Sequence, residues 1–290
     1  MKKCPYCKKV NSVRHGVRRT GVGLKRKYLC KSCKRHFTPD DGFKRFRHTA
    51  EVITAALGLR AKGLSLADVV DHLDQHHRVK VSRKTILDWQ NHFSERIKGH
   101  VQSLNPFLGS DFHADEMYVK IKKQWKYYWD CLDYKTKFLV ADHISHERNF
   151  EEATTFLNDV KRGSEKLPER LHTDNSYDYP PAIKRVFWKH VKHVHHPAWK
   201  KKFKNNPIER YHNTLKQRYK TMRNFDNLTS AYKFLEFFRL YYNYIRKHTS
   251  LQGKTPAQAA KIELSLGRNR LLSIIRKILH TLQIQRINLN

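Results

Sequence analysis

The chain has 290 residues, 59 of them Lys or Arg and 26 Asp or Glu, so its formal net charge is +33. A charge this far from zero adds self-repulsion to any compact fold. It indicates a polyanionic partner, with nucleic acid ahead of a membrane surface or a ribosomal site. No apolar run approaches the roughly 18 residues that span a bilayer, and the first residues lack the apolar core of a signal peptide, so we expect an intracellular protein. The length predicts two or three domains.

Two Cys-x-x-Cys pairs stand near the beginning of the chain. Cys4 and Cys7 form the first pair, Cys30 and Cys33 the second, with 22 residues between them. In a reducing compartment such pairs indicate metal before disulfides, because four thiolates suit one tetrahedral Zn²⁺. The segment is otherwise too polar to hold a core. We predict a zinc ribbon over residues 1–45 with one structural Zn²⁺, and free or redox-active thiols are the alternative.

Residues 46–100 contain three segments whose apolar residues recur at helical spacing. The second begins at Ser65 with a capping-box pattern, and the third begins at Ser82. Arg83 and Lys84 lie in the first turn of the third segment. Three short helices with bases at the start of the last are typical of a helix-turn-helix, which predicts DNA contacts by these two residues. A plain three-helix bundle explains the same periodicity.

From about residue 105 the pattern changes to period two mixed with helices. Three successive strands are followed by a helix, a strand, a helix and a strand. This order predicts an α/β fold with a mixed five-stranded sheet and flanking helices. The expected elements cover residues 111–120, 125–134, 137–144, 150–161, 170–174, 181–190 and 191–195.

Three carboxylates of this region fall where a sheet can gather them. Asp115 lies within the first strand, Asp174 ends the fourth, and Glu209 lies in the first turn of a helix that opens with Asn and Pro. Clustered carboxylates repel one another unless cations lie between them, and hard oxygen ligands suit Mg²⁺ or Mn²⁺. Two such ions, about 3.5–4 Å apart, can activate an attacking oxygen and stabilise a leaving oxygen at a phosphodiester. Glu116 is the weaker candidate, because strand alternation points it to the other face.

Basic residues follow Glu209 along the same predicted helix. Lys216 lies seven residues further on, two turns along the same face. Arg210, Arg218 and Lys220 add positive charge beside it. This arrangement predicts a metal site with a phosphate backbone held next to it, so we expect all four basic residues to contact DNA.

Three segments resemble the acidic motifs of DDE transposases and retroviral-type integrases. They are residues 113–116 (His-Ala-Asp-Glu), 172–175 (His-Thr-Asp-Asn) and 206–210 (Asn-Pro-Ile-Glu-Arg). The 34 residues between the second and third acids resemble the spacing of family-six insertion sequences in particular. The tail over residues 242–257 is similar to the closing motif of many integrase-type cores, and the cysteine and helical regions resemble the DNA-binding arm of longer members.

The resemblance implies an RNase H-like catalytic core over residues 105–262, followed by a basic C-terminal helix at 263–290. It implies a transposase that cleaves insertion-sequence ends and joins the 3′-hydroxyls to target DNA. Two Mg²⁺ or Mn²⁺ ions would be held by Asp115, Asp174 and Glu209. A non-catalytic DNA-binding regulator and a nuclease without strand transfer are the alternatives.

The resemblance also implies the partners of the protein. These are double-stranded DNA, at the terminal inverted repeats and at the target, and further copies of the chain in a homodimer or higher oligomer, because two ends must be joined. No membrane partner is expected, and the location is the cytoplasm of a prokaryote, at the nucleoid. Asn175, Arg210 and His212 are expected to assist at the metal site.

Other polar groups have ordinary interpretations. A histidine-rich stretch suggests a second zinc site, which we disfavour because no carboxylate partner is evident. Cys131 is expected to be a buried small hydrophobe, and the lysines at 200–202 a DNA-facing loop. Four further acids are expected to be surface or salt-bridge residues, with the third of them able to approach the centre: Asp111, Asp130, Asp133 and Asp142.

Overall fold

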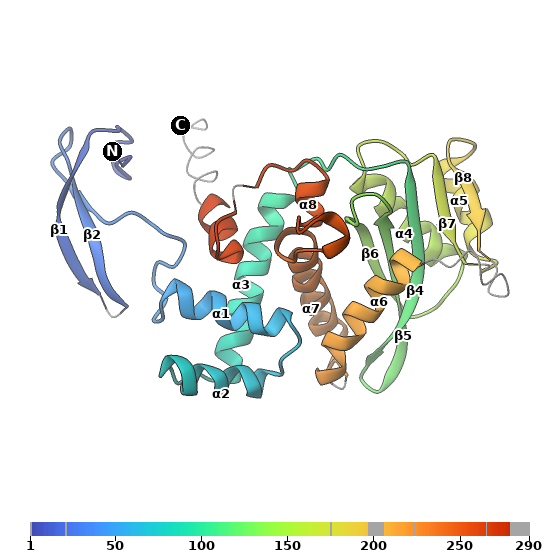
Figure 1. Ribbon diagram of the computed structural model, residues 1–290, viewed down its shortest axis with the longest axis horizontal. Helices are drawn as coiled ribbons and strands as arrows, with labels where there is room; N and C mark the ends of the chain where they lie inside the picture. Colours follow the sequence, from blue (N-terminus) through green and yellow to red (C-terminus); the bar gives the residue numbers. More distant parts are fainter. Residues whose placement is uncertain are drawn as a thin grey trace.

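The computed structural model of the protein describes residues 2–20, 22–174, 176–196, 206–222, 224–264 and 266–278. The interpretations given for Asn175, for the lysines at 200–202 and for residues 279–290 lie outside these ranges. Figure 1 shows three parts along the long axis: a small N-terminal sheet, a group of helices, and a larger sheet with helices on both faces.

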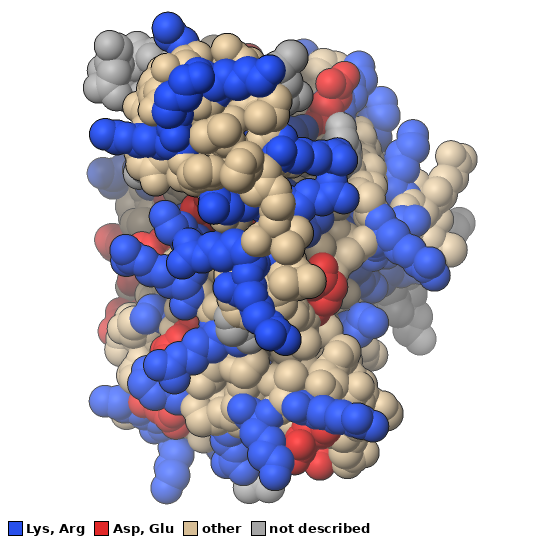
Figure 2. All heavy atoms as spheres, turned by 90° about the vertical axis from the view of Figure 1, so that its left-hand side faces the viewer, with Lys and Arg blue, Asp and Glu red and all other residues tan. Residues whose placement is uncertain are grey.

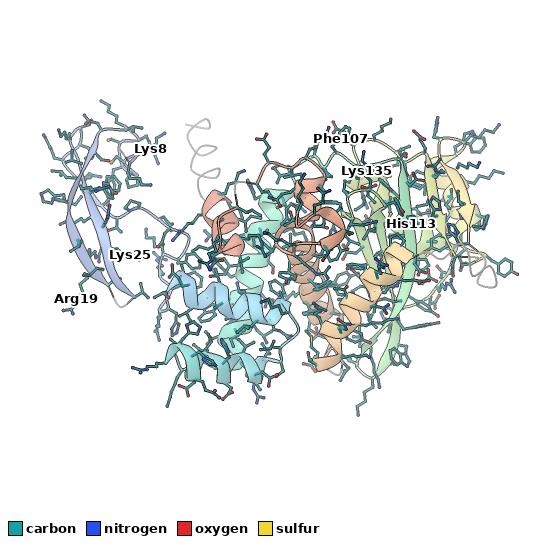
Figure 3. The ribbon with its side chains drawn as sticks, in the orientation of Figure 1. Lys8, Arg19, Lys25, Phe107, His113 and Lys135 are labelled. Carbon is teal, nitrogen blue, oxygen red and sulfur yellow. The ribbon has the colours of Figure 1, made fainter. Side chains whose placement is uncertain are left out.

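The N-terminal sheet has a very small core. Its three antiparallel strands leave most side chains exposed, and Cys4, Cys30 and Phe37 are the buried residues at its centre. Lys8 and Arg19 project from it (Figure 3). A core of this size does not stabilise a domain without a further constraint. The strands are β1 (Ser12–Thr20), β2 (Gly23–Cys30) and β3 (His36–Phe37).

Three helices follow, and each begins at a side chain that caps it. Thr49, Ser65 and Ser82 accept hydrogen bonds from backbone N–H groups of the first turns, and Ser65 forms a capping box with Asp68. The starts expected at Ser65 and Ser82 therefore agree with the structure. The helices are α1 (Ala50–Ala61), α2 (Leu66–His77) and α3 (Arg83–Val101).

These helices share a core with the C-terminal half of the chain. α3 packs along α7 (Leu228–Leu240), where Lys98 Nζ lies 2.5 Å from a carboxylate oxygen of Glu236. Arg60, buried at the end of α1, lies over the ring of Phe234 at 5.4 Å. Buried apolar residues of α1–α3 and of the larger sheet form one continuous cluster, so the helices are not an isolated bundle.

The larger sheet has five strands in the order β6-β5-β4-β7-β8. The first three in the chain form an antiparallel meander, while β7 pairs in parallel with β4 and β8 in parallel with β7. This is the mixed sheet of an RNase H-like α/β core, the fold class expected from the sequence. The strands are β4 (Asp111–Ile121), β5 (Gln124–Asp133), β6 (Leu139–Ser145), β7 (Arg170–Thr173) and β8 (Lys192–His195).

Helices cover both faces of this sheet (Figure 1). Trp129 on β5 packs against the rings of Phe156 and Tyr179, so α4 and α5 lie over one face. Tyr128, the preceding residue, points the other way, and its hydroxyl lies 3.1 Å from that of Tyr211. α4 (Phe150–Gly163) and α5 (Tyr179–Phe187) therefore cover one face, and α6 (Asn206–Tyr219) and α7 cover the other.

The segment after α7 ties the C-terminal part to the edge of the sheet. α7 is followed by a π-helical turn, Tyr241–Ile245. Within it the buried Asn243 side chain bonds the N–H and the carbonyl oxygen of Leu139, each at 2.9 Å, and so satisfies the edge strand β6. Of the C-terminal helices expected, α8 (Pro256–Ala259) is a single turn, and residues 270–278 are helical.

Positive charge dominates one end of the molecule. Figure 2 shows Lys and Arg side chains spread over the face formed by the N-terminal sheet and the neighbouring helices, with few acids between them. None of the helices in the described ranges is long and apolar enough to cross a membrane.

Candidate active site

Asp115 lies on the central strand β4, on the face that α6 covers. Its Oδ2 atom lies 3.7 Å from Nδ1 of His212 on α6. Burial raises the pKa of Asp115 above its ordinary value; the positive charge of His212 opposes this shift, and the charges of Asp174 and Glu209 add to it. The three carboxylates that the sequence singles out are therefore close enough to act on one another.

Asp174 follows the neighbouring strand β7 and lies next to Asp115. In the parallel pairing of β4 with β7, His113 lies opposite His172, so position 174 comes next to position 115. Oδ1 of Asp174 accepts a hydrogen bond from the N–H of Ser176 at 3.0 Å. Glu209 lies in the first turn of α6 and is exposed.

Glu116 remains beside this group although alternation turns its side chain to the α4 and α5 face. Asp115, Glu116 and Asp174 each offer one carboxylate oxygen, and these oxygens lie within 4.8 Å of one another. Glu116 accepts a hydrogen bond from the hydroxyl of Tyr179 at 2.9 Å and forms an ion pair with Arg148. Burial raises the pKa of Glu116 to about 8, against the opposing effect of Arg148.

Arg148 is a residue of this carboxylate group that the sequence pattern missed. It follows β6, and its Nη2 atom lies 3.0 Å from Asp174 Oδ2 while also contacting Glu116. One arginine among 59 Lys and Arg residues carries no signal of its own. The available clue was its place between the expected strand at 137–144 and the expected helix at 150–161, which puts it at the carboxyl end of β6.

His212 and Asp130 form a second group next to Asp115, and the sequence did not indicate that they would pair. Nε2 of His212 is 2.8 Å from Oδ2 of Asp130, and Asp130 is fully buried. Burial alone would lower the pKa of His212, but the charges of Asp130 and Asp115 outweigh it and raise that pKa. Asp130 was expected at the surface or in a salt bridge; it pairs with His212, as the second alternative predicts, but the pair is buried and holds His212 toward Asp115.

The other three acids have structural partners. Asp111 pairs with Arg170, and Asp142 lies 2.6 Å from Arg239, as expected of salt-bridge residues. Asp133, the last residue of β5, is fully buried rather than exposed, and its Oδ1 accepts a hydrogen bond from the N–H of Gly109 at 3.1 Å. Its Oδ2 accepts from the N–H of Thr136 at 2.8 Å, so it holds the turn after β5, and it lies opposite Phe112 rather than Asp115.

The basic residues expected on α6 have different surroundings. Lys216 and Arg210 are exposed, and Lys216 is close enough to His212 to oppose the rise in the pKa of that imidazole. Arg218 is half-buried, and its Nη1 donates to the carbonyl oxygen of Thr214 at 3.2 Å. Lys220 is exposed in the turn after α6.

In the first turn of α3, Arg83 and Lys84 are exposed, and Lys84 lies 3.0 Å from Asp88. The first turn of α3, which was expected to contact DNA, therefore faces solvent. Further along the same helix, Phe93, Ile97 and Val101 are buried in the core.

The four N-terminal cysteines form the second cluster of ligand atoms. Sγ of Cys4 lies 3.6 Å from Sγ of Cys33, and Sγ of Cys7 lies 3.4 Å from Sγ of Cys30. Four sulfurs bound at 2.3 Å to a tetrahedral ion would be separated by roughly 3.8 Å, so the arrangement fits Zn²⁺. Within the ranges that the structure describes, this cluster and the acidic one are the groups of three or more potential ligand residues.

Three histidines pack against one another at the histidine-rich stretch. His113 and His172 stack, with ring centroids 4.4 Å apart and an interplanar angle of 7°, while His196 lies beside His172, with its Nε2 2.7 Å from Nδ1 of His172. The histidines that suggested a second zinc site were His190, His193, His195 and His196. The ring centroids of His193 and His195 lie 3.9 Å apart, and within the described ranges none of the four belongs to a group of three or more potential ligand residues. Figure 3 labels His113 on its strand.

Comparison with known proteins agrees with this geometry. Residues 109–248 match the family model for a DDE domain. A transposase for the insertion sequence-like element IS431mec of Staphylococcus aureus is 23% identical over 224 residues, covering 77% of this chain and 98% of that protein. An uncharacterized protein of Methanocaldococcus jannaschii is 26% identical over 215 residues, covering 71% of this chain and 92% of that protein.

Solved structures also align with the chain. The catalytic core domain of HTLV-2 integrase in complex with magnesium aligns with a TM-score of 0.38 and 18% identity, over 54% of this chain and 98% of that one. A chain of the simian T-cell lymphotropic virus intasome aligns with a TM-score of 0.43 and 13% identity, over 71% of this chain and 74% of that one.

The RNase H-like sheet, the gathered carboxylates and the matched domain define a metal-dependent enzyme that processes nucleic acid. The DDE-domain match over residues 109–248 and the relatives that are transposases of insertion sequence-like elements support a DDE transposase of the family-six type. A DDE domain implies the use of divalent metal ions, and the transposase relatives imply DNA binding.

Proposed function

We propose that the protein cleaves DNA at the ends of an insertion sequence and joins the freed 3′-hydroxyls to target DNA by direct transesterification. Asp115, Asp174 and Glu209 would hold two Mg²⁺ or Mn²⁺ ions. The observation that carries the proposal is the placement of these carboxylates: Asp115 lies on β4 and Asp174 directly after its parallel neighbour β7, with oxygens within 4.8 Å of each other, and Glu209, in the first turn of α6, is near enough to add to the rise in the pKa of Asp115.

The donor set fits hard divalent cations. Burial and the negative charges of Asp174 and Glu209 all raise the pKa of Asp115. The three carboxylates are therefore disfavoured in their ionised form unless a cation lies between them. When bound, two such ions supply activation of the attacking oxygen and stabilisation of the leaving oxygen at the phosphodiester. The residues of the chain would bind and orient the scissile phosphate.

The side chains around the carboxylates would orient the metal ligands and hold the DNA backbone. Asp130 holds His212, and His212 would fix the orientation of Asp115 as the outer partner of a metal ligand does. Glu116 is held by Tyr179 and Arg148 on the face that α4 and α5 cover, which would leave Asp115 as the ligand from β4. Lys216 on the exposed side of α6 would hold the backbone of the strand to be cut.

DNA binding away from the carboxylates would fall to the N-terminal parts. We propose a zinc ribbon over residues 1–45 and a helix-turn-helix over 46–100, with Arg83 and Lys84 touching DNA. Residues 105–262 would be the catalytic core, and 263–290 a basic C-terminal segment, whose described helix covers 270–278 and not 263–264 or 266–269. Arg210, Arg218 and Lys220 would add phosphate contacts beside Lys216. Joining two ends would require a dimer or a larger assembly on the inverted repeats.

The test is a strand-transfer assay on labelled element ends with Mg²⁺. Glu209→Gln should abolish both cutting and joining, and Asp115→Asn and Asp174→Asn should do the same. Glu151→Gln is the matched control, because Glu151 is also an exposed glutamate in the first turn of a helix, α4. If Glu209→Gln joined ends as well as the control, the assignment would be wrong.

The same assay separates the alternatives. A wild-type protein that cuts the ends and never joins them would be a nuclease. A wild-type protein that binds the ends and cuts nothing with any divalent ion would be a regulator. The coupled carboxylates favour an enzyme, because binding DNA makes no use of three converging acids.

A further inference from the structure

The hairpin formed by β4 and β5 is longer than the other strands of the larger sheet and reaches beyond them (Figure 1). One face of its outer half is packed: Val119 and Ile121 are buried against the core under α6 and α7. Its outer edge is also paired, because the N–H of Phe225 donates to the carbonyl oxygen of Lys120 at 2.9 Å and the N–H of Lys122 donates back at 2.8 Å. The tip is therefore held in place from two sides.

The opposite face of this hairpin carries three aromatic side chains that we name the aromatic ledge: Tyr118, Trp125 and Tyr127. Tyr118 is 55% exposed and Trp125 is 57% exposed, while Tyr127 is half-buried. The ring of Tyr118 lies 5.0 Å from that of Tyr127 and 6.3 Å from that of Trp125. The solvent face of an antiparallel sheet normally carries polar residues, so a contiguous group of exposed rings indicates a binding surface.

Lysines surround the aromatic ledge. Nζ of Lys120 lies over the ring of Trp125 at 5.6 Å, and Lys122 and Lys123 are exposed in the turn beyond it. Rings interleaved with positive charge are the composition of surfaces that bind single-stranded nucleic acid, where bases stack on the rings and cations follow the backbone. A second copy of this basic chain would bring its own positive charge against these lysines, so charge favours a polyanion as the occupant.

The aromatic ledge begins next to the candidate active site. Tyr118 lies two residues beyond Glu116 on the same face of β4, a separation on the order of 7 Å along the strand. Tyr127 is within electrostatic reach of both Glu116 and Arg148. The ledge therefore continues the surface on which Arg148 joins Glu116 to Asp174.

We propose that the aromatic ledge stacks unpaired bases of the DNA strand that leaves the carboxylate site. The inference rests on the proposed function, since a DNA end cut on one strand frays and frees bases beside the cut. Trp125 and Tyr118 supply flat apolar surfaces that accept any base, and the lysines at the turn hold the backbone. The ligand is single-stranded DNA, bound without sequence preference.

The experiment measures binding of a dye-labelled oligo-dT to the full-length, zinc-loaded protein at fixed salt, with no Mg²⁺ or Mn²⁺ present. Trp125→Ala should weaken binding about tenfold, within the usual range for loss of one stacked base. Tyr118→Ala should give a similar loss from the other strand, and Trp125→Phe should restore most of the affinity. Trp188→Ala is the matched control, because Trp188 is 61% exposed and lies under Lys184 at 6.0 Å.

Three results would overturn the proposal. Trp125→Ala could bind oligo-dT as tightly as the Trp188→Ala control. The wild type could bind an abasic strand of the same length as tightly as oligo-dT, which would leave only phosphate contacts. Trp125→Ala could instead convert a dimer to a monomer in sedimentation with unchanged affinity for oligo-dT, which would make the ledge a contact between copies.

Failure of the proposed function would look different. Asp115→Asn should abolish strand cleavage in the presence of Mg²⁺ and leave oligo-dT binding unchanged. If cleavage survives in Asp115→Asn, the catalytic assignment fails while the ledge stands. If cleavage is lost as expected but the Trp125→Ala variant binds normally, the ledge fails while the catalytic assignment stands.

Discussion

The pair formed by His212 and Asp130 allows a sharp test of how the candidate active site is held together. Nε2 of His212 lies 2.8 Å from Oδ2 of Asp130, and the two side chains are 6% and 0% exposed. Within the described ranges the other oxygen, Oδ1 of Asp130, has no hydrogen-bond partner. His212→Ala therefore leaves a buried carboxylate without the group that neutralises it.

The burial of this pair sets the expected loss in the free energy of unfolding of His212→Ala. Removing one partner of a buried ion pair destabilises a protein by about 3–5 kcal/mol. For a chain of this size that corresponds to a fall in Tm of roughly 6–15 °C. The double variant Asp130→Ala/His212→Ala removes the stranded charge as well, so it should lose only about 2 kcal/mol, chiefly from the cavity. The two substitutions should thus couple by about 2 kcal/mol or more.

The assay is differential scanning calorimetry on the zinc-loaded chain. His143→Ala is the control, because His143 lies 2.7 Å from Glu152 in a pair whose side chains are 16% and 31% exposed. That variant should cost about 1 kcal/mol or less. The reasoning would be refuted if His212→Ala had the same Tm as the His143→Ala control. It would also be refuted if the stability lost in the double variant equalled the sum of the losses in the two single variants.

Three further predictions concern regions away from the carboxylates. Chelation of zinc, or Cys30→Ser, should unfold the N-terminal sheet, seen as loss of its amide protection, and leave the main melting transition in place; an unchanged sheet without zinc would contradict the metal assignment. Gly58→Ala should raise Tm by about 2–3 °C through helix propensity, because a Cβ there meets nothing within 4 Å, whereas Gly163→Ala should lower it, because its Cβ would lie 2.6 Å from a carbonyl oxygen; equal shifts would exclude this explanation. Burial lowers the pKa of His248 from 6.5 to about 4. Because the folded-state pKa is the lower one, this histidine contributes stability above pH 6.5 that is lost as the pH falls toward 4, and His248→Gln should remove about 2 kcal/mol of that loss in unfolding titrations; parallel profiles of variant and wild type would refute it.

Much of the larger sheet could be predicted because its signals are local. Asn149 accepts a hydrogen bond from Glu152 N–H and starts α4 where the cap residue predicted. The alternation of β4 also holds, since Asp115 and Glu116 face opposite sides of the sheet. The three successive strands predicted a meander, and the RNase H-like core came from the family resemblance; the order of the five strands comes from the structure.

The parts that could not be predicted depend on contacts between distant segments. Asp130 and His212 are 82 residues apart, and neither has a local pattern that distinguishes a buried pair from two surface groups. Arg148 acquires its role from the register that sets β6 beside β5, and Phe225 from its pairing with the tip of β4. Tertiary register decides each of these, and single-sequence periodicity carries no information about it.

The central claim is that Asp115, Asp174 and Glu209 hold the divalent ions of the reaction. The most direct measurement is the number of Mn²⁺ ions bound to the protein on an uncut end duplex, counted by electron paramagnetic resonance. Wild type and Glu151→Gln should bind two ions at these carboxylates, and Asp115→Asn should lose at least one of them. Two ions bound with unchanged affinity in Asp115→Asn would contradict the claim.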